Sequence, residues 1–383
     1  MSQPWFVPSA AYVHVPFCAH QCGYCDFAVA TNQDHQIDLY LDALEAEIAA
    51  SGAPHPVSTV FVGGGTPTHL NTKQLDRLFL TLRKYLPLLP EGEFSVEANP
   101  DDLSPETIYA LRDGNVTRVS IGVQSFDERH LPTLDRRHRA GHVADAVARA
   151  REHLAQVSLD LIFAVPGQTL ADWEADLARA VALSPDHVSA YGLTFEKGTP
   201  LWKQRERGRI RTVDEEDELA MYVRATELLE SSNYDQYEIS NFAKPGKRCR
   251  HNEVYWANHA HFGFGMGAAG YVGGVRSVNT RSLHEYIKRA LSGEPTAFQS
   301  EELAPRDRAV ETMAIQLRRS DGIHRTSFAA QTGFALDSLA GNAIAQLVEL
   351  ELLADDGATV RLTPRGRCVA DGIVEKLMTA RPS

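Results

Sequence analysis

Short apolar runs alternate with longer amphipathic stretches between residues 11 and 193. The short runs are rich in β-branched side chains and carry few charges, which is typical of strands buried on both faces. They predict strands at Ala11–Val15, Thr59–Val62, Phe94–Ala98, Arg118–Val123, Ser158–Phe163 and His187–Leu193.

The stretches between these runs have helical periodicity. Ile37, Leu41, Leu44 and Ile48 follow one another at steps of four, three and four, so they form one apolar stripe. A similar stripe covers residues 75–86. Six such βα units in succession predict a parallel sheet with helices outside, as in a partial (β/α)6 barrel. An open, doubly wound sheet is the alternative, because both folds alternate strands with helices.

The pattern changes after residue 193. We expect a helix at Asp214–Ser232 and a late strand at Asp235–Ile239. Residues 241–274 are rich in glycine, histidine, asparagine and aromatic residues, and we expect a long, irregular and functional segment there.

The composition shifts again near Ser300, which suggests a domain boundary. Three helices are predicted after it, followed by a hairpin around Asp356-Gly357 and a last helix at 366–377. This order resembles a winged-helix module. The predicted organisation is therefore a barrel (1–235), a connecting segment (236–300) and a winged-helix-like domain (301–383).

Composition narrows the class of protein. The 383 residues carry a net charge of −12, which argues against a nucleic-acid partner. Met1–Ala10 lacks the features of a signal peptide, and no run of about 18 apolar residues predicts a transmembrane helix. At most a transient membrane contact is expected. Five cysteines, three of them crowded together, do not suggest a disulfide framework and favour a reducing, cytoplasmic compartment.

The crowded cysteines carry the strongest chemical signal. Cys18, Cys22 and Cys25 follow the first predicted strand with CxxxCxxC spacing. Soft thiolates suit zinc or an iron–sulfur cluster, and structural zinc needs four ligands. Because no fourth cysteine is near, an iron–sulfur cluster with one open iron fits best; a zinc site and three packing cysteines are the alternatives.

The segment YVHVPFC from Tyr12 to Cys18, with this spacing, resembles the radical S-adenosylmethionine (SAM) superfamily. More narrowly, it resembles the family formed by oxygen-independent coproporphyrinogen III oxidases and HemW haem chaperones. The resemblance implies a [4Fe–4S] cluster on the three cysteines, with SAM on the open iron. It also implies a reductant such as flavodoxin or ferredoxin, which supplies the electron that cleaves SAM to a 5′-deoxyadenosyl radical.

Polar residues recur at the ends of successive predicted strands, which converge on one edge of such a sheet. A glycine run at 63–65 also lies there and allows close backbone approach to a ligand. Taken singly, a glycine run is as often a tight turn, and each polar residue is more often a structural hydrogen-bonding group than a ligand; their recurrence in successive units favours a binding site. By resemblance, the residues beside or bound to SAM are Tyr12, Tyr24, Gly64, Gly65, Thr66, Glu97, Gln124, Arg136 and Asp160.

A last group of residues suggests an iron porphyrin. Cys249-Arg250-His251-Asn252 is followed by Tyr255-Trp256, and together they offer axial ligands and flat apolar surfaces. The HNxxYW run resembles a HemW pattern linked to haem, which implies His251 or Cys249 as a haem ligand.

Two functions follow from the resemblance. The first is a haem chaperone that passes haem to respiratory proteins, with the cluster and SAM in a supporting part. The second is the oxidase, which decarboxylates its substrate by a radical mechanism. The similar oxidases carry a further cysteine where this chain has Phe27, and an N-terminal extension over the site. Both departures favour the chaperone, and whether the chain is an enzyme stays open.

Overall fold

The computed structural model describes residues 5–52, 54–136 and 140–380. Six parallel strands form the centre of its main sheet in sequence order, and shorter strands flank them. The central strands are β1 (Ala10–Val15), β4 (Val57–Gly64), β5 (Leu88–Ala98), β6 (Arg118–Gln124), β7 (Gln156–Phe163) and β8 (His187–Gly192). The edge strands are β11 (Phe262–Phe264), β10 (Asn241–Ala243) and β9 (Asp235–Gln236).

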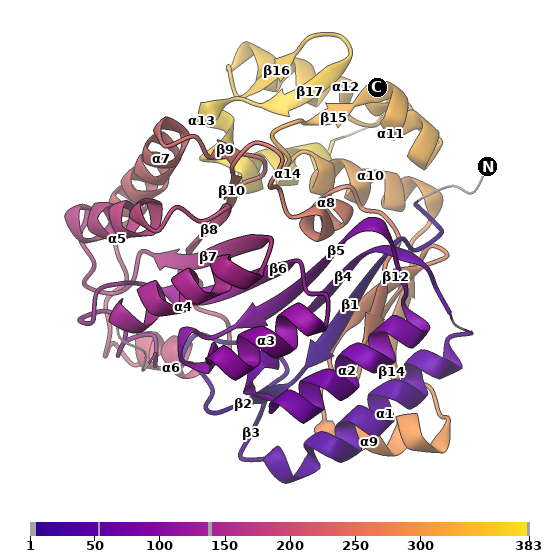
Figure 1. The fold of residues 1–383 in the computed structure, drawn as a ribbon. Helices are drawn as coiled ribbons and strands as arrows, with labels where there is room; N and C mark the ends of the chain where they lie inside the picture. The colour runs from indigo at the N-terminus through magenta and orange to yellow at the C-terminus, as the bar shows by residue number, and fades with distance from the viewer. Residues whose placement is uncertain (1–4, 53, 137–139, 381–383) are drawn as a thin grey trace.

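Helices follow the central strands and line the outer face of the sheet, as Figure 1 shows for α1 to α4. Right-handed crossovers between parallel strands that are adjacent in sequence and in space place the connecting helices, α1 to α5, on the same face. The sequential strand order confirms the partial (β/α)6 barrel and excludes the doubly wound sheet. The helices are α1 (Ile37–Ala50), α2 (Thr72–Tyr85), α3 (Pro105–Asp113), α4 (Ala140–His153), α5 (Leu170–Ala182), α6 (Pro200–Glu206) and α7 (Glu215–Ser231).

The apolar stripe and the helix cap predicted from the sequence are both present in these outer helices. Ile37, Leu41, Leu44 and Ile48 are all buried in the main core. Ser104 accepts a hydrogen bond from the Thr107 amide, so it caps α3 as its sequence indicates. Burial of such stripes against the sheet stabilises the barrel, at roughly 25 cal/mol per Å² of apolar surface.

The segment 241–274 differs from the prediction, because a helix and short strands make up half of it. It holds α8 (Arg250–Trp256), and its short strand β11 pairs in parallel with β1. It also holds β12 (Ala269–Val272), and β13 (Val275–Asn279), α9 (Leu283–Ser292) and β14 (Ala297–Glu302) follow it. The strands among these elements are too short for periodicity to reveal them, and sheet pairing rather than propensity fixes them. The late strand is also shorter than predicted, since β9 ends at Gln236.

The C-terminal elements gather at one end of the barrel around a second hydrophobic cluster (Figure 1). Helices and a three-stranded sheet make a winged-helix-like unit, which confirms the predicted class. Its elements are α10 (Pro305–Gln316), β15 (Ile323–His324), α11 (Arg325–Thr332), α12 (Leu336–Glu349), β16 (Leu353–Asp355), β17 (Thr359–Leu362), α13 (Pro364–Arg367) and α14 (Ala370–Met378).

Three details of this unit correct the prediction. The third helix begins at Leu336 and not at residue 342, and the last is divided between α13 and α14. The strand β15 was not predicted, because two residues carry no pattern. The boundaries at 235 and 300 stay predictions, and the outer ends of both terminal domains lie outside the described residues. No helix in the described part of the chain is long and apolar enough to span a bilayer.

Candidate cofactor and ligand cavity

A cavity of about 1290 Å³ lies on the inner side of the main sheet. We call the carboxyl ends of the parallel strands its mouth, and their amino ends, next to α8, its floor. Every site residue predicted from the sequence lines this cavity: Tyr12, Cys18, Cys22, Tyr24, Cys25, Gly64, Gly65, Thr66, Glu97, Gln124, Arg136, Asp160, Cys249 and His251.

The three cysteines lie in a loop at the mouth. A small parallel ribbon of β2 (Phe17–Cys18) and β3 (Ala30–Thr31) closes the two ends of this loop. The Cys18 thiol lies 3.4 Å from the Thr66 hydroxyl. Burial raises the pKa of Cys18 to about 12 and raises that of Cys25 as well. Thiols of this kind become thiolates when a metal stabilises their charge.

The spacing of the thiols distinguishes between metals. Among described residues, one group of three or more His, Cys, Asp or Glu side chains has all its ligand atoms within 4.8 Å of one another: Asp127, His130 and Asp172. Arg129 pairs with both of these carboxylates, so that group is an ion-pair network. The three thiols do not meet the same limit, whereas thiolates on one tetrahedral zinc ion lie about 3.8 Å apart. Their spread suits a larger, multi-iron centre.

The glycine run takes a conformation that only glycine accepts easily. Gly64 has φ of 115°, and a Cβ there would lie 2.4 Å from the His14 ring. A Cβ at Gly65 would lie 2.5 Å from the Pro16 carbonyl oxygen. The Gly64 amide donates a 2.9 Å hydrogen bond to Glu97. The run therefore brings bare backbone to the mouth, beside the cysteine loop.

Glu97 is a half-buried carboxylate that has few partners among the described residues. Burial raises its pKa to about 7; the Gly64 hydrogen bond opposes this, and nearby Asp160 adds to it. The group is thus balanced between its neutral and charged forms near neutral pH. Such a pKa is typical of a functional site.

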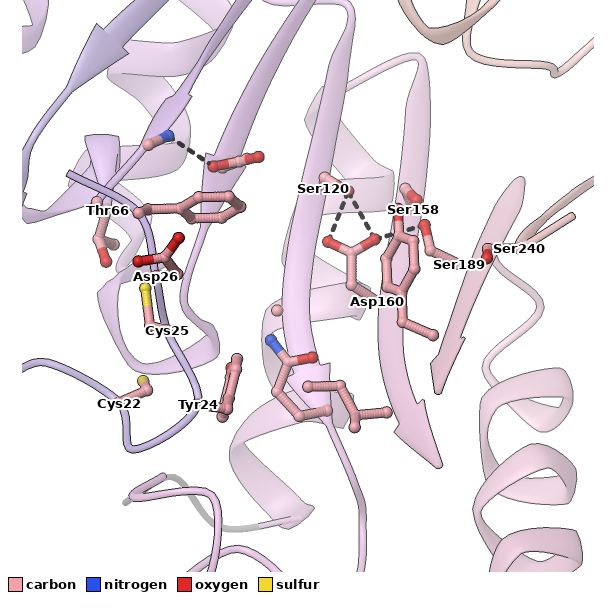
Figure 2. Close-up of a pocket in the computed structure, with 18 of the residues that line it drawn as sticks. Cys22, Tyr24, Cys25, Asp26, Thr66, Ser120, Ser158, Asp160, Ser189 and Ser240 are labelled. Carbon is pink, nitrogen blue, oxygen red and sulfur yellow. Dashed lines mark hydrogen bonds between the residues drawn. The ribbon is translucent and has the colours of Figure 1, made fainter. Parts of the chain in front are cut away.

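Asp160 faces the cysteine loop across the cavity, as Figure 2 shows. Ser120 on β6 donates to both carboxylate oxygens at 3.1 and 2.9 Å, and Ser189 on β8 donates at 2.7 Å. Burial raises the pKa of Asp160, against these two hydrogen-bonding serines. The two neighbouring strands thus fix the orientation of this carboxylate.

Gln124 and Arg136 complete the mouth. Gln124 ends β6 with φ of 65°, a strained conformation for a residue with a side chain. Arg136 donates to the Asn99 amide oxygen at 2.7 Å, and its other nitrogen lies 3.7 Å from the Cys22 sulfur. The guanidinium thus joins the end of β5 to the cysteine loop.

The floor is organised around Glu93, which the sequence analysis missed. Its carboxylate accepts hydrogen bonds from the backbone amides of Arg250 and His251, both at 3.2 Å, at the start of α8. It also pairs with the buried guanidinium of Arg118 and contacts the Cys249 thiol at 3.5 Å. Glu93 therefore holds α8 against the sheet and positions both predicted haem ligands.

Both predicted haem ligands are engaged by protein groups. The His251 ring nitrogens are 2.8 Å from the Thr59 hydroxyl and 3.0 Å from the Tyr255 hydroxyl. Burial lowers the pKa of His251 to about 3, and burial raises that of Cys249. An iron bond to either side chain would break one of these contacts.

Aromatic rings form a continuous surface along one side of the cavity. Neighbouring ring centres lie 6.4, 5.2, 4.9 and 4.6 Å apart, in stacked, tilted and edge-to-face pairs. We call this surface the aromatic wall; its members, in order, are Tyr12, Phe61, His251, Tyr255 and His261. Such a surface of aromatic faces and edges suits a conjugated ligand.

Several cavity residues were missed although the sequence carries a signal for them. Every second residue of a strand faces the same side. Besides the predicted Gln124 and Asp160, the polar or small residues at alternate positions of these otherwise apolar strands line the cavity: Arg118, Ser120 and Gly122 on β6, Ser158 on β7, and His187, Ser189 and Tyr191 on β8. Glu93 lies on the same face as Glu97, four residues earlier.

Known proteins resemble this chain over its whole length. The profile of the Radical SAM superfamily matches residues 12–180, and that of the HemN C-terminal domain matches residues 303–369. A Bacillus subtilis protein, heme chaperone HemW, is 39% identical over 95% of this chain and 97% of its own. The chain belongs to the HemW family of radical SAM proteins.

Two further relatives agree. Heme chaperone HemW of Lactococcus lactis is 35% identical over 97% of each chain. The structure of coproporphyrinogen III oxidase (HemN) of Escherichia coli, a radical SAM enzyme, superposes with a TM-score of 0.86. It covers 99% of this chain and 92% of the oxidase at 24% identity, so this likeness shows the fold alone.

Membership of the superfamily implies a [4Fe–4S] cluster and SAM, and the mouth fits both. Three spread thiols match a cluster that leaves one iron free. Glycine backbone that lines the cavity and two half-buried carboxylates, Glu97 and Asp160, offer acceptors for the ammonium and hydroxyl groups of SAM. The assignment of individual residues to these groups remains a proposal.

Proposed function

We propose that this chain is a haem chaperone, which binds haem in the cavity and passes it to haem-requiring respiratory proteins. The single observation that carries the proposal is a cavity with two chemically different halves. The mouth is polar and presents thiols, and the other half presents the aromatic wall. Its volume of about 1290 Å³ exceeds the roughly 300–1,000 Å³ usual for one small ligand. Room therefore remains for a porphyrin beside SAM.

In this proposal the mouth holds a [4Fe–4S] cluster on Cys18, Cys22 and Cys25, and a flavodoxin- or ferredoxin-like reductant serves it. The cluster would supply one-electron chemistry toward SAM. The chain's own part is to orient: Asp160 is fixed by two serines, and Gly64 and Gly65 allow close approach. The unpaired cysteine thiols suit the reducing cytoplasm.

The oxidase is the second candidate, because the whole fold matches that of HemN. The residue Phe27 argues against oxidase activity. This side chain occupies the position where the similar oxidases carry a further cysteine, and it lines the cavity rim with 64% of its surface exposed. A phenyl ring cannot transfer a proton or a hydrogen atom as a thiol can.

One preparation tests both candidates. The protein is reconstituted with iron and sulfide under anaerobic conditions, and one part is titrated with hemin while the Soret band is followed. The other part is incubated with coproporphyrinogen III, SAM and a reductant. We expect saturable hemin binding with one site, no decarboxylation, and transfer of the bound haem to a haem-free respiratory cytochrome.

A pair of tyrosine variants gives the control. Tyr255→Ala removes the ring between His251 and His261 from the aromatic wall and should weaken hemin binding about tenfold. Tyr109→Ala removes an exposed ring on α3, outside the cavity, and should leave binding unchanged. Absence of saturable binding, or turnover of coproporphyrinogen III, would overturn the chaperone proposal.

A further inference from the structure

Four of the described histidines line the cavity: His20, His187, His251 and His261. A neutral imidazole ligates iron through a ring nitrogen that has a free lone pair. His187 has none to offer, because its nitrogens are 2.7 Å from the Ser158 hydroxyl and 2.9 Å from the Tyr237 hydroxyl. His251 is engaged at both nitrogens in the same way.

His261 differs from these two at its ring nitrogens. Its Nδ1 lies 3.1 Å from the His259 carbonyl oxygen. A carbonyl can only accept, so Nδ1 carries the hydrogen and the lone pair is on Nε2. Within the described part of the chain, Nε2 has no hydrogen-bond partner, and it is not an atom enclosed away from solvent. Burial lowers the pKa of His261 to about 4, so the ring is neutral at physiological pH.

The ring of His261 is also held in place. Its backbone exchanges two 2.8 Å hydrogen bonds with Tyr271 just before β11. The Tyr255 ring packs edge-to-face against it, with centres 4.6 Å apart and planes at 86°. His261 thus forms one end of the aromatic wall with its orientation fixed before any ligand arrives.

His20 is a weaker candidate, because its surroundings belong to the cluster. It lies on the exposed cysteine loop, between Cys18 and Cys22, and its Nε2 donates to the Asp135 carbonyl oxygen at 2.6 Å. A porphyrin bound there would meet the cysteine loop and not the aromatic wall.

We propose that Nε2 of His261 is the protein ligand to the haem iron. This inference rests on the proposed haem binding, and it replaces neither the cluster nor the SAM site. An imidazole whose Nδ1–H is bound to a backbone carbonyl, with Nε2 directed at the metal, is the arrangement that fixes the tautomer and raises ligand basicity. The contacts of His251 and Cys249 stay intact in this arrangement.

The test compares three histidine variants of the full-length, cluster-loaded protein, each titrated with hemin. His261→Ala should raise the hemin dissociation constant at least roughly tenfold and change the Soret position and the ferric EPR signal. Added imidazole should restore both spectra in His261→Ala, which a purely structural loss would not allow. His261→Met should give a spectrum distinct from both, since a thioether replaces the imidazole.

His259→Ala is the matched control, because the residue is two positions away and lies outside the cavity, and its backbone carbonyl remains. It should bind hemin with the wild-type spectrum and affinity. His251→Ala removes a ring of the aromatic wall, so it should weaken hemin binding but keep the wild-type spectrum. The ligand assignment fails if His261→Ala keeps the wild-type spectrum and affinity, or if His251→Ala alone loses the wild-type spectrum; haem binding itself would then stand. If the wild-type protein gives no saturable spectrum, the haem proposal fails, and the ligand assignment fails with it.

Discussion

Two glutamates of β5 occupy the same face of one strand and face different surroundings. Glu93, at the floor, is bound by two α8 amides, the Cys249 thiol and the Arg118 guanidinium. Glu97, about 13 Å farther along the strand, has one hydrogen bond, from the Gly64 amide. At the floor, protein groups alone satisfy the carboxylate. At the mouth, the carboxylate keeps acceptor capacity that a ligand can use. Variants at the floor should lose stability, and variants at the mouth should lose cofactors.

The largest expected effect is the loss of a cofactor at the mouth. Cys22→Ser should abolish the broad absorbance near about 400 nm that a reconstituted [4Fe–4S] cluster gives, because a hydroxyl replaces one of the thiolates. Cys368→Ser, in the C-terminal unit and outside the cavity, should keep it. Iron and sulfide analysis checks the result; a Cys22→Ser protein with full cluster content would contradict the site. Unfolding of the cluster-free protein in urea should not change.

At the floor, Glu93→Gln should destabilise the fold by about 3–5 kcal/mol, since it leaves the Arg118 charge buried and unpaired. The neighbouring Glu91→Gln is the matched control: that side chain is exposed on the same strand, and its loss should change stability by less than about 0.5 kcal/mol. Urea denaturation measures both. Equal stability of the two variants would remove the distinction between floor and mouth.

Glu97→Gln should change the free energy of unfolding in the opposite direction and stabilise the fold. The pKa of Glu97 rises from 4.5 to about 7 on folding, because the carboxyl is buried. Its contribution to stability is therefore present below pH 4.5 and is lost as the pH rises through about 7. That loss amounts to about 3 kcal/mol at most. The variant lacks this loss.

Unfolding of the SAM-free protein in urea at pH 4.5 and pH 8 checks this expectation. Glu97→Gln should match the wild type at the lower pH and exceed its stability at the higher one. A variant that is less stable than the wild type at pH 8 would show that Glu97 is a structural group like Glu93.

The contrast between Glu93 and Glu97 also explains which features could be predicted from the sequence. The barrel, the cysteine loop and the mouth residues were predictable, because strand order and motif spacing can be read directly from the sequence. The side chains at the carboxyl ends of parallel strands then converge on one edge of the sheet. Glu93 was not, since nothing near it in sequence reveals that α8, more than 150 residues later, would begin against it. The regular structure at 241–274 was missed for the same reason: long-range pairing fixes it. The free nitrogen of His261 depends on a carbonyl and a bridge partner that only the fold supplies.

The smallest expected effect concerns SAM affinity, and it distinguishes the charge of Asp160 from the orientation of its carboxylate. Asp160→Asn should raise the SAM dissociation constant about tenfold, because a charged acceptor contributes roughly 1.5–3 kcal/mol to a hydrogen bond. Ser189→Ala keeps the charge but removes one of the groups that orient it, so its effect should be smaller.

Asp176→Asn is the control for loss of a buried carboxylate, since this residue binds Ser125 and the Phe126 amide outside the cavity. It should leave SAM affinity unchanged and affect stability alone. Calorimetric titration of the cluster-loaded proteins with SAM gives all three values. If Asp160→Asn binds SAM as the wild type does, the two serines hold a structural carboxylate, and Asp160 then belongs with Glu93 rather than with Glu97.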